Sequence, residues 1–167
     1  MPPRRILEIG PGPSPLHHRG IENSLQLKDN EEYHGIDSHE GMSERTVWKQ
    51  AKEEYGDRVF LYQGDRTDLH QIANNSMDEL VALGTYGRNG KAVREFDRVL
   101  KEGGKLLLGT NTSNEQALRE SWGARLERRG YQELPSKTKR YTHKGNTSAE
   151  SPFIVLVWQK GYSEESH

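Results

Sequence analysis

The chain has 167 residues, of which 31% are hydrophobic, carries a formal net charge of −1 and contains no cysteine. This length suits one domain with a sizeable core, and we expect a single domain over residues 1–162 with a frayed tail over 163–167. The near-zero charge gives no overall attraction to nucleic acid or to a membrane surface. Without cysteine, a disulfide framework, a thiolate zinc site and a cysteine nucleophile are excluded.

Membrane insertion is also not expected, because no apolar run approaches the roughly 20 residues that span a bilayer. The opening residues Met1–Arg5 lead directly into the first expected strand. We therefore expect a cytoplasmic protein without a signal peptide.

Strand and helix patterns alternate along the chain. Strands are expected at Arg5–Ile9, Tyr33–Asp37, Val59–Gln63, Asp78–Leu83, Lys105–Thr110 and Phe153–Gln159. Helical spacing marks three helices, carried by Trp48, Ala51 and Tyr55, by Val93, Phe96 and Leu100, and by Leu118, Trp122 and Leu126. We expect the second helix to end at Gly103-Gly104 and the third near Gly130. This alternation predicts an α/β fold with a mostly parallel, helix-covered sheet.

The segment ILEIGPGPSP, from Ile6 to Pro15, is the most informative stretch of the sequence. It is typical of a short buried strand that runs into a ligand-binding loop. Gly10 and Gly12 have no Cβ, so the turn can take positive φ and allow close approach of a ligand. Glu8 is unusual in an apolar strand, since a buried acid needs a partner. An acid just before Gly-x-Gly suggests a site that handles a cation.

The ends of the other strands carry matching features. Parallel sheets bind ligands beyond the carboxyl ends of their strands. Asp37 ends the second strand and suits the paired hydroxyls of a ribose, while Gly64 and Asp65 follow the third and could receive an exocyclic amine. The segment GTYG, at Gly84–Gly87, follows the fourth. Together these residues predict a pocket for an adenosine-type ligand.

These motifs resemble the class I S-adenosylmethionine-dependent methyltransferases. Glu8-Ile9-Gly10-Pro11-Gly12 is similar to the family's first motif, Asp37 to its ribose-binding acid, and Gly64-Asp65, with Arg66, to its adenine-contacting pair. RVLKEGG, at Arg98–Gly104, is similar to the family's post-motif. The sequence departs from the pattern where Ser14 replaces the usual third glycine. The helix after this motif is irregular, and the helices that commonly precede the first strand are absent.

The resemblance implies a Rossmann-like three-layer sandwich: a mostly parallel seven-stranded sheet with an antiparallel last strand and helices on both faces. It also implies S-adenosyl-L-methionine as cofactor and an in-line methyl transfer. The cofactor-binding residues it implies are Glu8, Gly10, Pro11, Gly12, Asp37, Ser38, Gly64, Asp65, Arg66 and Gly84. Glu8 would lie near the cationic, amino-acid end of the cofactor, and Gly84, Thr85 and Tyr86 near the methyl group and the acceptor.

Several of these residues have simpler interpretations. Asp37 could cap a helix that begins at SHEGM, and Asp65 or Asp68 could cap a helix at Leu69. Tyr86 is a pocket-wall residue or, less often, a catalytic acid or base. His17 and His18 are expected to be exposed, with His18 the other candidate base. No His and acid pair has metal-ligand spacing, so no metal site is expected.

KTKRYTHK, at Lys137–Lys144, is the one local cluster of positive charge, within a polar segment expected to be a long loop over residues 136–151. A solvated loop is the simpler interpretation. If Tyr131–Leu134 begins a parallel sixth strand, however, the loop to an antiparallel seventh strand overhangs the acceptor pocket. Lys139, Arg140 and Lys144 could then meet an anionic acceptor or a phosphate backbone.

Three function classes stay open at this point. The favoured one is a methyltransferase whose acceptor is a small molecule, a protein or RNA. The second is a non-catalytic module that binds the cofactor or a partner, since a second chain or another copy could complete the pocket. A nicotinamide oxidoreductase is less favoured, because its motif needs a third glycine where this chain has Pro15.

Overall fold

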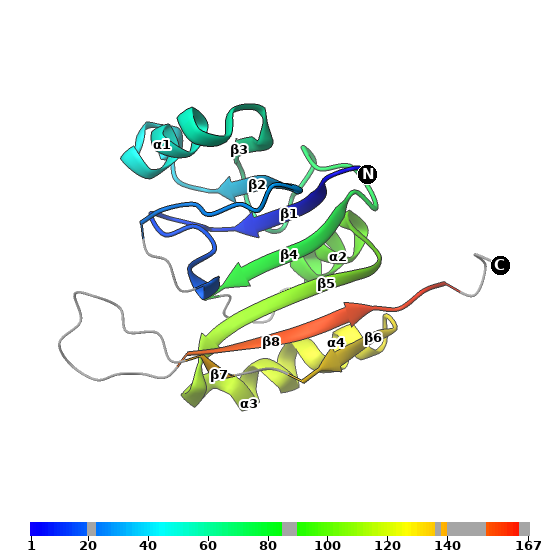
Figure 1. Ribbon diagram of the computed structural model, residues 1–167. Coiled ribbons are helices and arrows are strands. Elements are labelled where there is room, and N and C mark those ends of the chain that lie inside the picture. Colours follow the sequence, from blue (N-terminus) through cyan, green and yellow to red (C-terminus); the bar gives the residue numbers. More distant parts are fainter. Residues whose placement is uncertain (20–22, 85–89, 136–137, 140–152, 164–167) are drawn as a thin grey trace.

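The computed structural model describes residues 1–19, 23–84, 90–135, 138–139 and 153–163, and one β-sheet forms its centre (Figure 1). The strands are β1 Arg4–Ile9, β2 Glu31–Asp37, β3 Val59–Gln63, β4 Met77–Leu83, β5 Leu100–Asn111, β6 Tyr131–Leu134, β7 Thr138–Lys139 and β8 Phe153–Lys160. The α-helices are α1 Thr46–Tyr55, α2 Gly90–Val99, α3 Glu115–Leu118 and α4 Ala124–Glu127. Short helical turns are η1 His17–Arg19, η2 Met42–Glu44, η3 Gly56–Arg58, η4 Thr112–Asn114 and η5 Arg119–Gly123.

The strand order and directions confirm the Rossmann-like prediction. The sheet runs β3-β2-β1-β4-β5-β8-β6, with β7 beside β8. The pairs from β3 to β5 are all parallel, whereas β8 is antiparallel to both β5 and β6. Figure 1 shows β8 pointing against β1, β2 and β4. Strand β6 therefore runs in the direction of β5, as predicted, and the strand order reverses between β1 and β4, where such sheets bind ligands.

Helices cover both faces of the sheet. Helix α1 packs on the face over β1–β3, where Trp48 is buried and stacks on Tyr33 with ring centroids 5.7 Å apart. The opposite face carries α2 and the run of helix from α3 through the π-helical turn η5 to α4. There Phe96 of α2 stacks on Trp122 at 5.6 Å and joins these helices in one core.

The helix between β4 and β5 ends earlier than the sequence predicted. Leu100 fits the helical spacing, but in the structure it already pairs with Met77 as the first residue of β5. Helix α2 therefore ends at Val99, and Gly103-Gly104 lie within β5, where Gly103 has a φ of 73°. An apolar residue satisfies either a helix face or a buried strand, so spacing alone misplaced this boundary.

Three other segments differ from expectation. Between β1 and β2, the described residues contain one helical turn, the three-residue η1, where the resemblance implied an irregular helix. The SHEGM segment does not begin an α-helix, since η2 starts at Met42 and α1 at Thr46. The segment over residues 136–151, predicted to be a loop, contains the short strand β7, and the rest of it lies outside the described residues.

At the chain end, Ser163, the first residue of the predicted tail, donates a hydrogen bond from its backbone N–H to Glu102 at 3.2 Å. Residues 164–167 lie outside the described part. None of the helices described is long and apolar enough to cross a membrane.

The Phe96–Trp122 contact gives a test of the core. Because Trp122 is 1% exposed, Trp122→Ala leaves a cavity between η5 and α2 and is expected to cost about 3–5 kcal/mol of unfolding free energy. Urea denaturation measures this loss. The exposed neighbour Glu127, replaced by Ala, serves as the control and should change stability by less than about 0.5 kcal/mol. Equal effects of the two variants would contradict this core assignment.

Candidate functional site

The turn after β1 extends the sheet and then opens to solvent. The Gly10 N–H donates to the Ile36 carbonyl at 2.8 Å, which continues the β1–β2 pairing by one residue. Gly10 and Gly12 have φ values of 63° and 56°, a conformation that side chains disfavour. A Cβ at either position would meet nothing within 4 Å. The backbone conformation thus requires glycine at both positions. The open space beside them would allow a ligand to contact the main chain.

Asp37 joins this turn to the end of β2. Its Oδ2 accepts the Gly12 N–H at 3.2 Å, and its Oδ1 accepts the His39 N–H at 2.9 Å. The side chain is only partly buried. Since each carboxylate oxygen has two lone pairs, the group keeps acceptor capacity for further donors such as hydroxyls. The predicted pair of Gly12 and Asp37 is therefore brought together by a direct contact.

The turn after β3 lies beside Asp37. The Gly64 N–H donates to the Asp37 carbonyl at 3.0 Å. Asp65 is exposed, and its Oδ1 accepts from the Thr67 backbone and hydroxyl at 2.7 and 2.6 Å, hydrogen bonds that lower the pKa of this carboxyl. No helix begins at Leu69, so the helix-cap interpretation of Asp65 and Asp68 is wrong. Instead the Leu69 N–H donates to Glu95 at 2.7 Å.

The remaining predicted positions lie at the same edge of the sheet or outside the described residues. Ser38 is exposed and Arg66 is partly buried. Gly84 is exposed at the end of β4 with a φ of 78°, and its N–H donates to the Gly109 carbonyl at 2.9 Å. Lys139 lies in β7, paired with Phe153 at the start of β8. Thr85, Tyr86 and Arg140 lie outside the described residues.

Glu8 has a structural role that the sequence did not indicate. Its side chain is 1% exposed, and both carboxyl oxygens accept the Leu16 N–H, at 2.9 and 3.1 Å. The Tyr33 hydroxyl donates to Oε1 at 2.7 Å. Burial raises the pKa of Glu8 to about 7, although these hydrogen bonds and the charge of Arg19 act in the opposite direction. The observed hydrogen-bond partners of Glu8 are thus neutral donors from its own surroundings, and contact with a ligand cation stays a prediction.

The contact with Leu16 also supports an unusual backbone. Leu16 has a φ of 48° and is 2% exposed. A leucine in this left-handed conformation costs on the order of 1–3 kcal/mol, so it persists only where its surroundings fix it. The Glu8 carboxyl and the apolar packing of the leucine side chain provide that constraint. The adjacent turn η1 follows directly, and in it His18 is buried at 9% exposure, so the expectation that His18 is exposed was wrong.

A second buried acid, missed by the sequence analysis, anchors the far part of the same loop. Glu31 is 1% exposed and accepts two hydrogen bonds from Arg19, at 2.8 and 2.9 Å, and one from Arg4 at 3.1 Å. These hydrogen bonds and charges outweigh desolvation and lower the pKa of Glu31 to about 2. Little in the sequence indicated burial of Glu31, because the second strand was predicted to begin at Tyr33, two residues after this acid.

Comparison with known proteins agrees with this geometry. Residues 7–108 match the model of a family described as a methyltransferase domain, and this chain belongs to that family. A search of curated proteins finds no match.

Solved structures share the fold at low sequence identity. The YcgJ protein from Bacillus subtilis has 18% identity and a TM-score of 0.66, covering 96% of this chain and 93% of its own. A SAM-dependent methyltransferase from Aquifex aeolicus has 14% identity and a TM-score of 0.65, covering 93% and 81%. The [4+2]-cyclase SpnF has 16% identity and a TM-score of 0.65, covering 97% and 76%.

The raised pKa of Glu8 predicts a specific dependence of stability on pH. Its folded value, about 7, lies above the ordinary 4.5, so the folded state holds a proton that the unfolded state releases first. The stability contributed by this proton is present below pH 4.5 and is lost as pH rises to 7, a loss of about 3 kcal/mol. Glu8→Gln removes this loss, and chemical denaturation at several pH values measures the difference from the wild type.

Tyr33→Phe provides the matched control. It removes a hydrogen bond that lowers the Glu8 pKa, so the loss of stability should extend above pH 7. Parallel stability curves for wild type and Glu8→Gln between pH 4.5 and 7 would contradict the assignment.

Proposed function

We propose that this protein transfers a methyl group from S-adenosylmethionine to an acceptor bound beyond the end of β4. The family membership supports methyl-transfer chemistry, and one contact carries the assignment to this site. The Gly12–Asp37 hydrogen bond at 3.2 Å puts a partly exposed carboxylate beside an open glycine turn. A carboxylate that can accept two hydroxyls next to accessible backbone fits a nucleoside with an attached amino-acid chain.

Each turn has a proposed share in binding. The backbone of Gly10–Gly12, with Pro11 between the glycines, faces the amino-acid portion, and Asp37 accepts hydrogen bonds from the ribose hydroxyls. Ser38 and Gly64–Arg66 lie along the adenine, where Asp65 receives the exocyclic amine. Glu8 acts on this region through Leu16, whose position fixes the end of the glycine loop.

The chemical demands on the protein are modest. When bound, the cofactor supplies an electrophilic methyl group on a sulfonium that is already a good leaving group. The residues of this chain then have to align an acceptor atom and exclude water, and positioning of this kind is worth roughly 7–11 kcal/mol. Gly84, Thr85 and Tyr86 are the proposed acceptor-side residues, with Lys139 and Arg140 for an anionic acceptor. A base is needed only where the acceptor is protonated, and Tyr86 and His18 are the candidates.

A non-catalytic binding module is the alternative, and the fold does not decide between them. The structural similarity to a [4+2]-cyclase illustrates that one fold serves different reactions. Binding and turnover therefore have to be measured separately. Calorimetry with S-adenosylmethionine, S-adenosylhomocysteine and NAD tests the site. Release of S-adenosylhomocysteine in a cell extract supplied with tritium-labelled S-adenosylmethionine tests catalysis.

The role of Asp37 can be tested by substitution. Asp37→Ala removes the proposed ribose acceptor and should weaken S-adenosylhomocysteine binding at least about tenfold, the effect of losing hydrogen bonds to a charged group. Calorimetry measures the change. Asp57→Ala, which removes the same charge from η3 at the amino end of β3, is the control and should bind normally.

The ligand provides a second control. For an analogue that lacks the 2′ and 3′ hydroxyls, wild type and Asp37→Ala should bind alike. An equal loss of affinity for both ligands would contradict ribose recognition by Asp37.

A further inference from the structure

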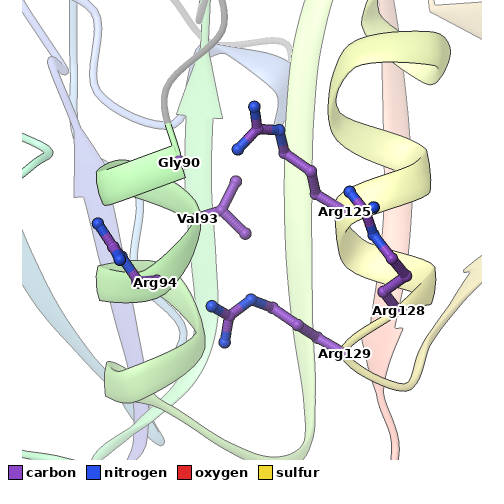
Figure 2. A pocket seen from close by; sticks show the side chains of 6 residues that line it. All are labelled: Gly90, Val93, Arg94, Arg125, Arg128 and Arg129. Atoms are coloured by element: carbon purple, nitrogen blue, oxygen red, sulfur yellow. The ribbon is translucent and has the colours of Figure 1, made fainter.

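A cleft lined by arginine lies between α2 and α4, and its lining includes none of the residues assigned to the glycine turns. Its volume is about 420 Å³, and it is lined by Gly90, Val93, Arg94, Arg125, Arg128 and Arg129. Figure 2 shows the guanidinium of Arg125 extending toward Gly90 and that of Arg129 extending toward α2. A Cβ on Gly90 would lie 2.6 Å from an Arg125 nitrogen, so the absence of a side chain there makes room for this guanidinium.

Helical periodicity explains why these cations share one space. Arg94 follows Gly90 by four residues on α2, and Arg128 and Arg129 follow Arg125 by three and four. Residues at these spacings lie on one side of a helix. Arg128 continues the α4 conformation, with its N–H bonded to the Ala124 carbonyl. Figure 2 shows Arg125 and Arg129 extending into the space between the helices, whereas Arg94 extends from the other side of α2 and Arg128 lies along α4, both at the edge of the cleft.

Nearby carboxylates leave most of this charge uncompensated. Arg129 pairs with Asp97 at 2.9 Å, and that acid also contacts Lys160 and Tyr131. Within the described residues, no hydrogen bond or ion pair involves the guanidiniums of Arg94, Arg125 or Arg128.

Glu95 on α2 and Glu115 on the neighbouring helix α3 have partners outside the cleft. Glu95 pairs with Arg98, and Glu115 pairs with Arg119. Glu127 is exposed and does not line the cleft; it lies two residues from Arg125, on another side of α4.

The helix orientation adds to the positive potential. Helix α2 has ten residues and begins at the cleft, with no acidic residue in its first turn. The first N–H groups of a helix have no partner within it and carry partial positive charge. Like charges gathered around one cavity repel each other, and a bound anion would remove this cost.

We propose that this cleft binds two or more linked phosphate groups. Arginine pairs with phosphate through two parallel hydrogen bonds, and several guanidiniums around one cavity suit more than one phosphate. Among the described residues that line the cleft, Val93 is the one apolar side chain and none is aromatic, so these residues offer no ring on which a base could stack. It therefore recognises phosphates without reading bases. The ligand is either a small polyphosphate or the backbone of a single-stranded nucleic acid, and this proposal does not require methyl transfer.

The test compares two ligands and two charge-reversal pairs. Tripolyphosphate binding is measured by calorimetry, and binding of a fluorescein-labelled 12-nucleotide single-stranded RNA by anisotropy at low salt. The cleft variant is Arg125→Glu with Arg128→Glu. The control is Lys49→Glu with Lys105→Glu, which makes the same change in net charge from exposed positions on α1 and β5.

The wild type is expected to bind at least one ligand, the cleft variant at least tenfold more weakly, and the control within about twofold of wild type. For the RNA, the cleft variant should also reduce the slope of log affinity against log salt by about 2. If the wild type binds RNA more tightly than tripolyphosphate and the slope changes in this way, the ligand is a nucleic-acid backbone. If it binds tripolyphosphate alone, the ligand is a small polyphosphate.

Three results would overturn the proposal: no binding of either ligand, equal binding by wild type and cleft variant, or equal weakening by the control pair. A further variant, Arg125→Lys with Arg128→Lys, controls for a folding defect caused by charge reversal. It keeps the charge but loses the guanidinium fork, so it should bind with intermediate affinity. Calorimetry with S-adenosylhomocysteine, measured on every variant, reports on the glycine turns alone and separates failure of this proposal from failure of the proposed function.

Discussion

The buried carboxyl group of Glu8 fixes the loop on which the candidate site depends. A carboxyl in the central strand of an apolar sheet is costly, and its burial is offset here by the Leu16 N–H and the Tyr33 hydroxyl. The hydrogen bond from the Leu16 N–H to Glu8 also holds Leu16 in a left-handed conformation that leucine rarely adopts. In the described residues the chain thereby turns back across β1 with only the short turn η1 and no α-helix. The positive φ values of Gly10 and Gly12 lie between β1 and this fixed point, so the shape of the open turn follows from the Glu8 contacts.

A second ion-pair network holds the same loop further along. Arg19 reaches Glu31 at the start of β2, so the loop is attached at the carboxyl end of β1 through Glu8 and at the amino end of β2 through Glu31. Burial acts to raise the pKa of both acids, but the net shifts are opposite because their partners differ. Neutral donors leave the pKa of Glu8 raised, whereas two arginines lower that of Glu31. Hydrogen bonds and ion pairs thus hold this loop in the way that the apolar face of an α-helix otherwise would. This suits a chain in which only 31% of the residues are hydrophobic.

The sheet and the turns could be predicted because their signals are local. Apolar runs ending in glycine or acid mark the strand ends, and parallel pairing then brings Gly12 to Asp37. The contacts of Glu8 could not be predicted, since a backbone N–H has no sequence signature and Tyr33 lies on the neighbouring strand. Leu100 was placed in a helix because an apolar residue suits helix and strand equally. His18 was expected outside because its burial depends on the irregular path of the loop, which periodicity does not describe.

Overall charge was similarly uninformative, because the structure distributes the acids unevenly among the bases. A net charge of −1 gives no overall attraction to nucleic acid, yet charge acts locally over roughly one Debye length, about 10 Å at 0.1 M salt. On α2 the acids at 95 and 97 pair with Arg98 and Arg129, whereas Arg94 projects from the intervening side of the helix. On α4 the arginines at three- and four-residue spacing have no acid among them on that side. The electrostatic potential in the cleft therefore depends on which face of each helix carries the acids. The net charge of the chain does not contain this information.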